Sequence, residues 1–123
     1  MNNNAKLMSI VFDLGEPLFT REYPSDIVQF QTFTTVQTNT PIWTPGANNS
    51  IYLTALQISS LAPVVVEINR ENNSPFMSIA ITDTLATYGI SFSSPIKFNP
   101  DEIISITTSA ASTVSITLLG YEL

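Results

Sequence analysis

The stretch ISITTSAASTVSITL, residues 104–118, decides the fold. Isoleucine alternates with Ser and Thr at its start, and after the small-residue turn 109–112 the alternation resumes at Val114. A period of two places apolar side chains on one face of a strand and polar side chains on the other. The stretch therefore predicts two antiparallel strands joined by a short turn. We prefer this interpretation to a membrane span, although residues 103–121 carry no charge and are long enough to cross a bilayer.

The same period of two recurs along the chain, and short turns rich in Pro, Asn, Gly and Ser separate the runs. No segment has a convincing 3.6-residue apolar stripe, and only residues 83–87 have the pattern of a single helical turn. The sequence therefore predicts an all-β protein, an antiparallel β-sandwich. The side chains expected to face its core are Tyr52, Leu56 and Ile58; Val64, Val66 and Ile68; Met77, Ile79 and Ile81; Tyr88, Ile90 and Phe92; Ile104 and Ile106; and Val114, Ile116 and Leu118.

Charge is scarce and unevenly distributed. Charged residues make up 11% of the chain, against about 25% in typical soluble domains. Six of the 14 lie in residues 1–26, and none lies from Ile27 to Val66. This shift predicts an N-terminal arm or edge element over residues 1–26 and a β-sandwich domain over residues 27–123. We first expect contacts with neighbouring subunits in the charge-free stretch, because uncharged faces of identical copies do not repel one another.

Composition disfavours several classes of function. A net charge of −6 repels a phosphate backbone, so no nucleic-acid partner is expected. The chain has no histidine and no cysteine, which removes the usual general base, the thiol nucleophile and the soft metal ligands. We therefore expect no catalytic, metal or cofactor-binding site, and a protein that is not an enzyme. The remaining acidic candidates, which follow no spacing of a glycosidase pair or a calcium loop, are Glu67, Glu71, Asp83, Asp101 and Glu102.

Large apolar side chains in the predicted arm are candidates for an assembly interface. An arm outside a sandwich cannot bury them by itself, and exposed apolar patches usually mark a partner surface. The alternative is that residues 7–14 form another strand of the same domain. The candidates are Phe12, Leu14, Leu18, Phe19 and Tyr23.

Trp43, the only tryptophan, is the sixth interface candidate. Pro41 and Pro45 flank it, which suits an edge strand or an extended loop. We interpret its ring as a rim residue that covers the core or as an anchor in a subunit contact. Both interpretations are favoured over a sugar-stacking platform.

Seven stretches from Thr40 onward follow one another in a recognisable order. They are TPIWTPG (40–46), IYLTALQIS (51–59), VVVEIN (64–69), SPIKFNPDE (94–102), ISITT (104–108), VSIT (114–117) and GYE (120–122). This succession of strands and turns resembles small jelly-roll-like β-sandwich proteins in the virions of tailed phages. Such proteins are head decoration, auxiliary capsid or head-fibre components. The resemblance covers residues 30–123 and includes no catalytic residue.

The resemblance implies a structural virion protein, a capsid decoration or auxiliary protein that docks on the phage head as a homotrimer. Its partners would be copies of itself and the major capsid protein or other virion proteins, with no nucleic acid and no membrane. It would lie on the outer surface of the particle. Synthesis in the host cytoplasm is expected, because the apolar run 7–12 is too short for a secretory signal peptide.

An alternative function is a carbohydrate- or receptor-binding β-sandwich module at a tail or fibre tip. Aromatic side chains would then be stacking platforms, with Asn-rich loops as hydrogen-bonding partners. The aromatic candidates are Trp43, Tyr52, Tyr88 and Tyr121.

Overall fold

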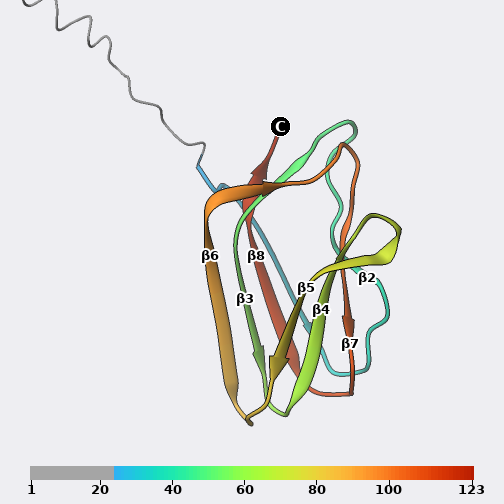
Figure 1. Ribbon diagram of the computed structural model, residues 1–123, viewed down its shortest axis with the longest axis vertical. Coiled ribbons are helices and arrows are strands. Elements are labelled where there is room, and N and C mark those ends of the chain that lie inside the picture. Colours follow the sequence, from blue (N-terminus) through green and yellow to red (C-terminus); the bar gives the residue numbers. More distant parts are fainter. Residues whose placement is uncertain (1–23) are drawn as a thin grey trace, which may run out of the picture.

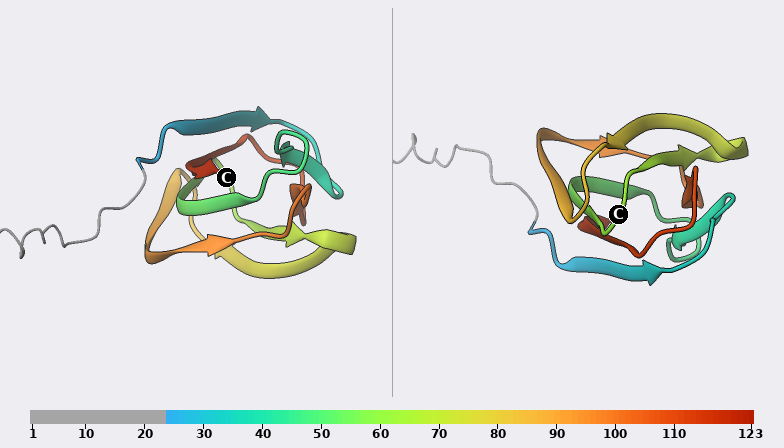
Figure 2. Two further views of the ribbon diagram at one scale, coloured as in Figure 1. Left: turned by 90° about the horizontal axis from the view of Figure 1, so that it is seen from above. Right: turned by 90° about the horizontal axis from the view of Figure 1, so that it is seen from below.

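The computed structural model describes residues 24–123, which form eight β-strands in two four-stranded antiparallel sheets packed face to face (Figures 1 and 2). The prediction of an all-β antiparallel sandwich is confirmed. The predicted arm, residues 1–26, lies almost entirely outside the described residues. The elements are β1 (Ile27–Phe33), β2 (Thr40–Trp43), β3 (Ile51–Ser60), β4 (Val64–Arg70), the 3-10 turn η1 (Glu71–Asn73), β5 (Ser74–Ile81), β6 (Ala86–Lys97), β7 (Ile104–Thr108) and β8 (Val114–Glu122).

The strands pair from the two ends of the chain inward. The first strand pairs with the last, β2 with β7, β3 with β6, and β4 with β5. Two further ladders, β3 with β8 and β4 with β7, join these pairs into sheets of order β1-β8-β3-β6 and β2-β7-β4-β5. Every connection except the one between β4 and β5 therefore crosses from one sheet to the other.

The core lies between the two sheets, and most of the expected inward residues line it. In β8 the alternation is strict from Val114 to Gly120, and Ile116 and Leu118 are fully buried; in β4 Val66 and Ile68 are fully buried, and Asn69 is buried as well. The segment 103–121 forms β7, a turn and most of β8, as its alternation predicted. Tyr88 was expected to face the core, but it lies on the edge strand β6 and is exposed.

Tyr52, expected to face the core together with Leu56, lies on the outer face instead. The reason is a β-bulge in β3, where Thr54 is an extra residue relative to β8. The buried positions are therefore odd-numbered before the bulge, as for Leu53, and even-numbered after it, as for Leu56. The hydroxyl of Thr54 donates a hydrogen bond to the carbonyl oxygen of Leu119 at 3.0 Å, which stabilises the point where the ladder is interrupted.

The predicted helical turn at residues 83–87 is wrong. This segment is a tight turn that leads into β6 at Ala86. Leu85 has a φ of +54°, a left-handed conformation that cannot continue a right-handed helix.

Gly120 is required by close packing at the centre of the first sheet. It lies in β8 opposite Leu53, and a β-carbon at this position would overlap the carbonyl oxygen of Tyr52 and lie 3.2 Å from the ring of Trp43. Gly89 in β6 differs, because a β-carbon there would lie 3.8 Å or more from its nearest neighbours. Both glycines lie in strands, but only Gly120 is fixed by its surroundings.

We expect Gly120→Ala to lower the free energy of unfolding by about 3 kcal/mol or to prevent folding, because a backbone atom of β3 must move to admit the methyl group. Gly89→Ala is the matched control and should change stability by less than about 1 kcal/mol. Urea unfolding followed by tryptophan fluorescence measures both variants. Equal stability of the two variants would contradict the packing argument.

Candidate functional site

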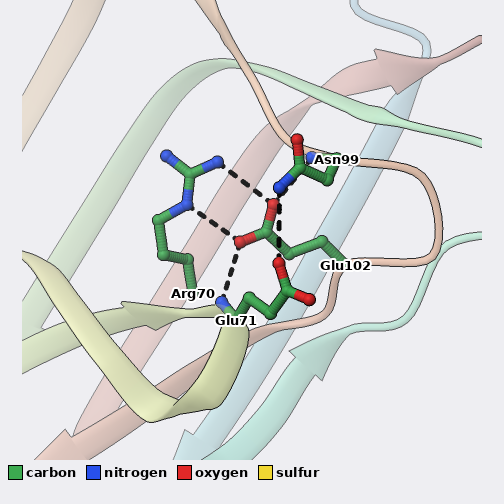
Figure 3. Close-up of polar contacts among 4 residues, drawn as sticks. All are labelled: Arg70, Glu71, Asn99 and Glu102. Carbon is green, nitrogen blue, oxygen red and sulfur yellow. Dashed lines mark hydrogen bonds and ion pairs between the residues drawn. The ribbon is translucent and has the colours of Figure 1, made fainter.

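The most organised polar cluster lies at one end of the second sheet (Figure 3). Arg70 is the last residue of β4, Glu71 opens the 3-10 turn, and Asn99 and Glu102 lie in the loop between β6 and β7. The side chain of Glu102 is only 1% exposed, whereas that of Arg70 is 32% exposed. The cluster therefore places one carboxylate inside the protein and its cationic partner at the surface.

Four hydrogen bonds converge on the carboxylate of Glu102. The Nε and Nη2 atoms of Arg70 donate to its two oxygens at 2.9 and 3.1 Å. The backbone N–H groups of Glu71 and Asn99 donate to the same two oxygens at 2.8 and 2.7 Å. A bidentate guanidinium with two backbone donors satisfies a buried carboxylate well. The result is a tie between the end of β4 and the β6–β7 loop.

The hydrogen bond from Arg70 is the main reason that the pKa of Glu102 falls to about 2, against the opposing effect of burial. The same pairing raises the pKa of Arg70. Glu102 is therefore ionised at any physiological pH, and it is not poised to exchange a proton as a general acid or base would be. We interpret the cluster as structural.

Aromatic packing supports the exposed partner of this pair. The guanidinium of Arg70 lies 4.7 Å from the ring centre of Phe98, which is fully buried. Phe98 in turn contacts Phe76 edge to face, with ring centres 5.4 Å apart. A cation held over an aromatic face gains additional stabilisation, which keeps Arg70 in place above Glu102.

A surface hollow of about 360 Å³ lies beside the cluster, between the β2 end of the sheet and the turn at Pro100. Its walls carry Arg70, Glu71 and Glu102 together with neutral side chains such as Asn39 and Ser105. Among residues 24–123, no three acidic, His or Cys side chains are grouped so that they could hold a metal ion. Asp101 also lines the hollow, which is therefore bordered by three acidic residues and one arginine.

A second carboxylate, Glu122 at the end of β8, ties down the loop after β2. The indole Nε1 of Trp43 donates to it at 2.7 Å, the backbone N–H of Gly46 at 3.0 Å and the amide of Asn49 at 3.1 Å. Burial raises the pKa of Glu122, but the hydrogen bonds from these three donors outweigh it and the pKa lies below its usual value. It is therefore the ionised carboxylate of Glu122 that holds the loop.

Trp43 is 0% exposed, so its side chain has no surface to offer to a second subunit or to a sugar ring. Flanking prolines indicated an edge strand, and β2 is indeed an edge strand, but the ring turns into the core and bonds to Glu122. The pairing with a carboxylate 79 residues away is what the local sequence could not reveal. The other interface candidates, Phe12, Leu14, Leu18, Phe19 and Tyr23, lie outside the described residues.

The outer face of the β1-β8-β3-β6 sheet carries a block of uncharged side chains, and Lys97 lies beyond this block at the level of Tyr52. In β3 and β8 its residues alternate with buried ones and so point away from the core, and the ladders place its β1 and β6 residues beside them. We call this surface the uncharged face. It consists of Val28, Phe30 and Thr32 in β1; Ser115, Thr117 and Leu119 in β8; Ala55, Gln57 and Ser59 in β3; and Thr87, Gly89 and Ser91 in β6.

Two large apolar side chains project from the β1 edge of the uncharged face. Val28 is 58% exposed and Phe30 is 61% exposed. Both lie in the charge-free stretch in which a contact with neighbouring subunits was expected. The residues of β6 on the same face were missed, because only the strand register brings them beside β3.

Comparison with known proteins adds no relative: no family model matches the chain, and no match was found among curated proteins. Within residues 24–123, no helix has the length and apolar character needed to span a membrane.

We expect the stability of the protein to fall between about pH 4.5 and pH 2, in part because Glu102 must bind a proton. Its pKa is lower in the folded chain than the usual 4.5, so the ionised form favours folding above pH 4.5 and this contribution is lost as the pH falls toward 2. Glu102→Gln should lose about 2 kcal/mol at pH 7 and show a smaller decrease between pH 7 and pH 3 than the wild type. Urea unfolding at the two pH values measures both effects.

Glu67→Gln is the matched control, since Glu67 is a half-buried glutamate on the outer face of the second sheet, away from the cluster. It should leave the stability at pH 7 close to that of the wild type. An acid dependence that is the same in Glu102→Gln as in the wild type would refute the assignment to Glu102.

Proposed function

We propose that the protein is a self-associating structural subunit of a larger particle, and specifically a decoration or auxiliary subunit of a phage capsid. The observation that carries the proposal is the uncharged face, a sheet surface without charge and with two projecting apolar side chains on β1. Depletion of charge and exposure of apolar groups are features of the centre of protein interfaces. The remaining surface of a soluble domain is ordinarily rich in charge.

We also propose that the fold is a jelly roll, as the resemblance implies. The support is the strand pairing, in which β1 to β4 pair with β8 to β5 as if one long hairpin had been wrapped into two sheets. Eight strands in two sheets are the architecture of jelly rolls, which are frequent in viral capsid proteins. This link to virions is an argument from fold analogy, and the surface argument stands without it.

The described polar clusters support a structural role over a catalytic one. Glu102 and Glu122 are both occupied by hydrogen bonds that favour their ionised forms. Each connects a loop to a strand end, and both oxygens of each carboxylate accept at least one hydrogen bond. These contacts stabilise a subunit, which suits a protein that must persist in an assembled particle.

Three of the four aromatic side chains that were candidates for stacking on a sugar are buried or packed against another side chain. Trp43 is buried, while Tyr52 and Tyr121 stack on each other with ring centres 4.9 Å apart and planes within 7°. Lys97 also lies over the ring of Tyr52 at 5.8 Å. These rings are therefore committed to one another, and no described observation favours sugar binding over assembly.

Light scattering of the purified full chain should give a mass of more than one chain, and the resemblance implies three. Mass spectrometry of purified particles from the virus that encodes the chain should detect it in a fixed ratio to the major capsid protein. A chain that is monomeric at all concentrations and absent from the particles would overturn the proposal. Presence in the particles only in trace, variable amounts would also count against it.

A further inference from the structure

The uncharged face is arranged in rows that run straight across the four strands. Residues that are paired in successive ladders lie at one level of the sheet, so each row joins one residue from each of β1, β8, β3 and β6. The three rows are Val28-Leu119-Ala55-Ser91, Phe30-Thr117-Gln57-Gly89 and Thr32-Ser115-Ser59-Thr87.

In two of the three rows the residue on β1 is larger than the residue on β6. In the third row both are threonine. Phe30 and Val28 project from β1, while Gly89 and Ser91 occupy the same levels of β6. A hollow of about 240 Å³ lies over Gly89 and its neighbours on β3 and β8. The face therefore protrudes at its β1 edge and is hollow at its β6 edge. The protrusion and the hollow lie at the same position along the strand direction.

A two-fold axis parallel to the strands, between β8 and β3, relates these two edges. Rotation about it lays a second copy face to face on the first, with β1 of one copy over β6 of the other and β8 over β3. Because the axis runs along the strands, each row meets the same row of the partner copy. Phe30 of each copy then lies over Gly89 of the other, and a self-complementary contact is made twice.

The positions of the charged residues that border the face are also compatible with this two-fold rotation. Asp26 precedes β1 by one residue, and Lys97 ends β6 at the level of Tyr52 and Tyr121. Continuing the β1 ladder by one residue places Asp26 at that same level. The rotation therefore brings an acidic residue of one copy to a basic residue of the other at both ends of the contact, which favours this orientation over one that pairs like charges.

We propose that two copies of the chain dimerise through their uncharged faces about this two-fold axis, with the side chain of Phe30 in the hollow over Gly89 of the partner copy. The face measures about 400 Å² per copy from strand and residue spacings, or about 800 Å² in the dimer, which is below the roughly 1,200 Å² at which specific interfaces begin. The dimer is therefore expected to be weak and concentration-dependent in isolation. The inference rests on the proposed function and names the partner of the uncharged face as a second copy; it predicts a contact between two chains, where the resemblance implies three.

Cysteine cross-linking tests the geometry, because the natural chain has no cysteine. Chains carrying Phe30→Cys are mixed with chains carrying Gly89→Cys and treated with a short bismaleimide. The two positions are three strands apart within one copy, about 14 Å, but face each other across the proposed dimer. We expect a covalent dimer from the mixture and little from either variant alone.

Phe30→Cys mixed with Ala80→Cys is the negative control, since Ala80 is exposed on the outer face of the second sheet. Cross-linking of Phe30→Cys with itself would indicate edge-to-edge pairing of β1 and overturn the face-to-face arrangement. Oligomers that form no Phe30–Gly89 cross-link would overturn this interface and leave self-association intact. A cross-linked dimer that is absent from particles would instead support the interface and contradict the proposed function.

Filling the hollow gives a second test. Gly89→Leu has room for its β-carbon within the subunit, so the fold should be retained. Its side chain would occupy the space proposed for Phe30 and should weaken dimerisation at least tenfold in analytical ultracentrifugation. Ala80→Leu places the same side chain on the other sheet and should leave dimerisation unchanged; equal effects of the two variants would refute the proposal.

Discussion

The central position of β8 is the constraint on which the rest of the structure depends. This last strand lies between β1 and β3, so the first sheet is complete only when the two ends of the chain have met. Gly120 allows β8 to approach β3 closely, and Glu122 at its end holds the loop after β2 through Trp43. Almost all pairing in the sandwich is therefore long-range, and such topologies fold slowly because distant segments must be brought together first.

Two hydrogen-bonded carboxylates, one buried and one half-buried, explain how a chain with so few charges holds its loops. Glu102 joins the end of β4 to the β6–β7 loop, and Glu122 joins the end of β8 to the loop after β2. Each is surrounded by donors, so the cost of removing its charge from water is offset by hydrogen bonds. With these charges at loop junctions, the twelve residues of the uncharged face carry none. The scarcity of charge on the surface and its concentration at loop junctions are thus two aspects of one arrangement.

The fold class followed from local periodicity, because strands with one buried face record that face in every second residue. The same reasoning failed for Tyr52, since the single extra residue at Thr54 exchanges the two faces and leaves no signal in composition. Trp43 was recognised as special, but its partner Glu122 lies at the far end of the chain. The uncharged face was anticipated for its β1 and β3 parts, which lie in the charge-free stretch, but not for β6, because Gly89 comes beside Gln57 only through the strand register.

The edges of the two sheets show a difference that bears on assembly. β2, β5 and β6 each contain a proline, at positions 41, 75 and 95, and proline limits the addition of a further strand to an open edge. β1 is the fourth edge strand, and residues 27–33 contain no proline, no glycine and no charge. An edge of this kind is a liability in an isolated subunit, but it is tolerable where another copy lies against its projecting side chains. The edge of β1, without proline, glycine or charge, and the apolar side chains on its outer face both support the proposal that this side of the sandwich contacts a second copy.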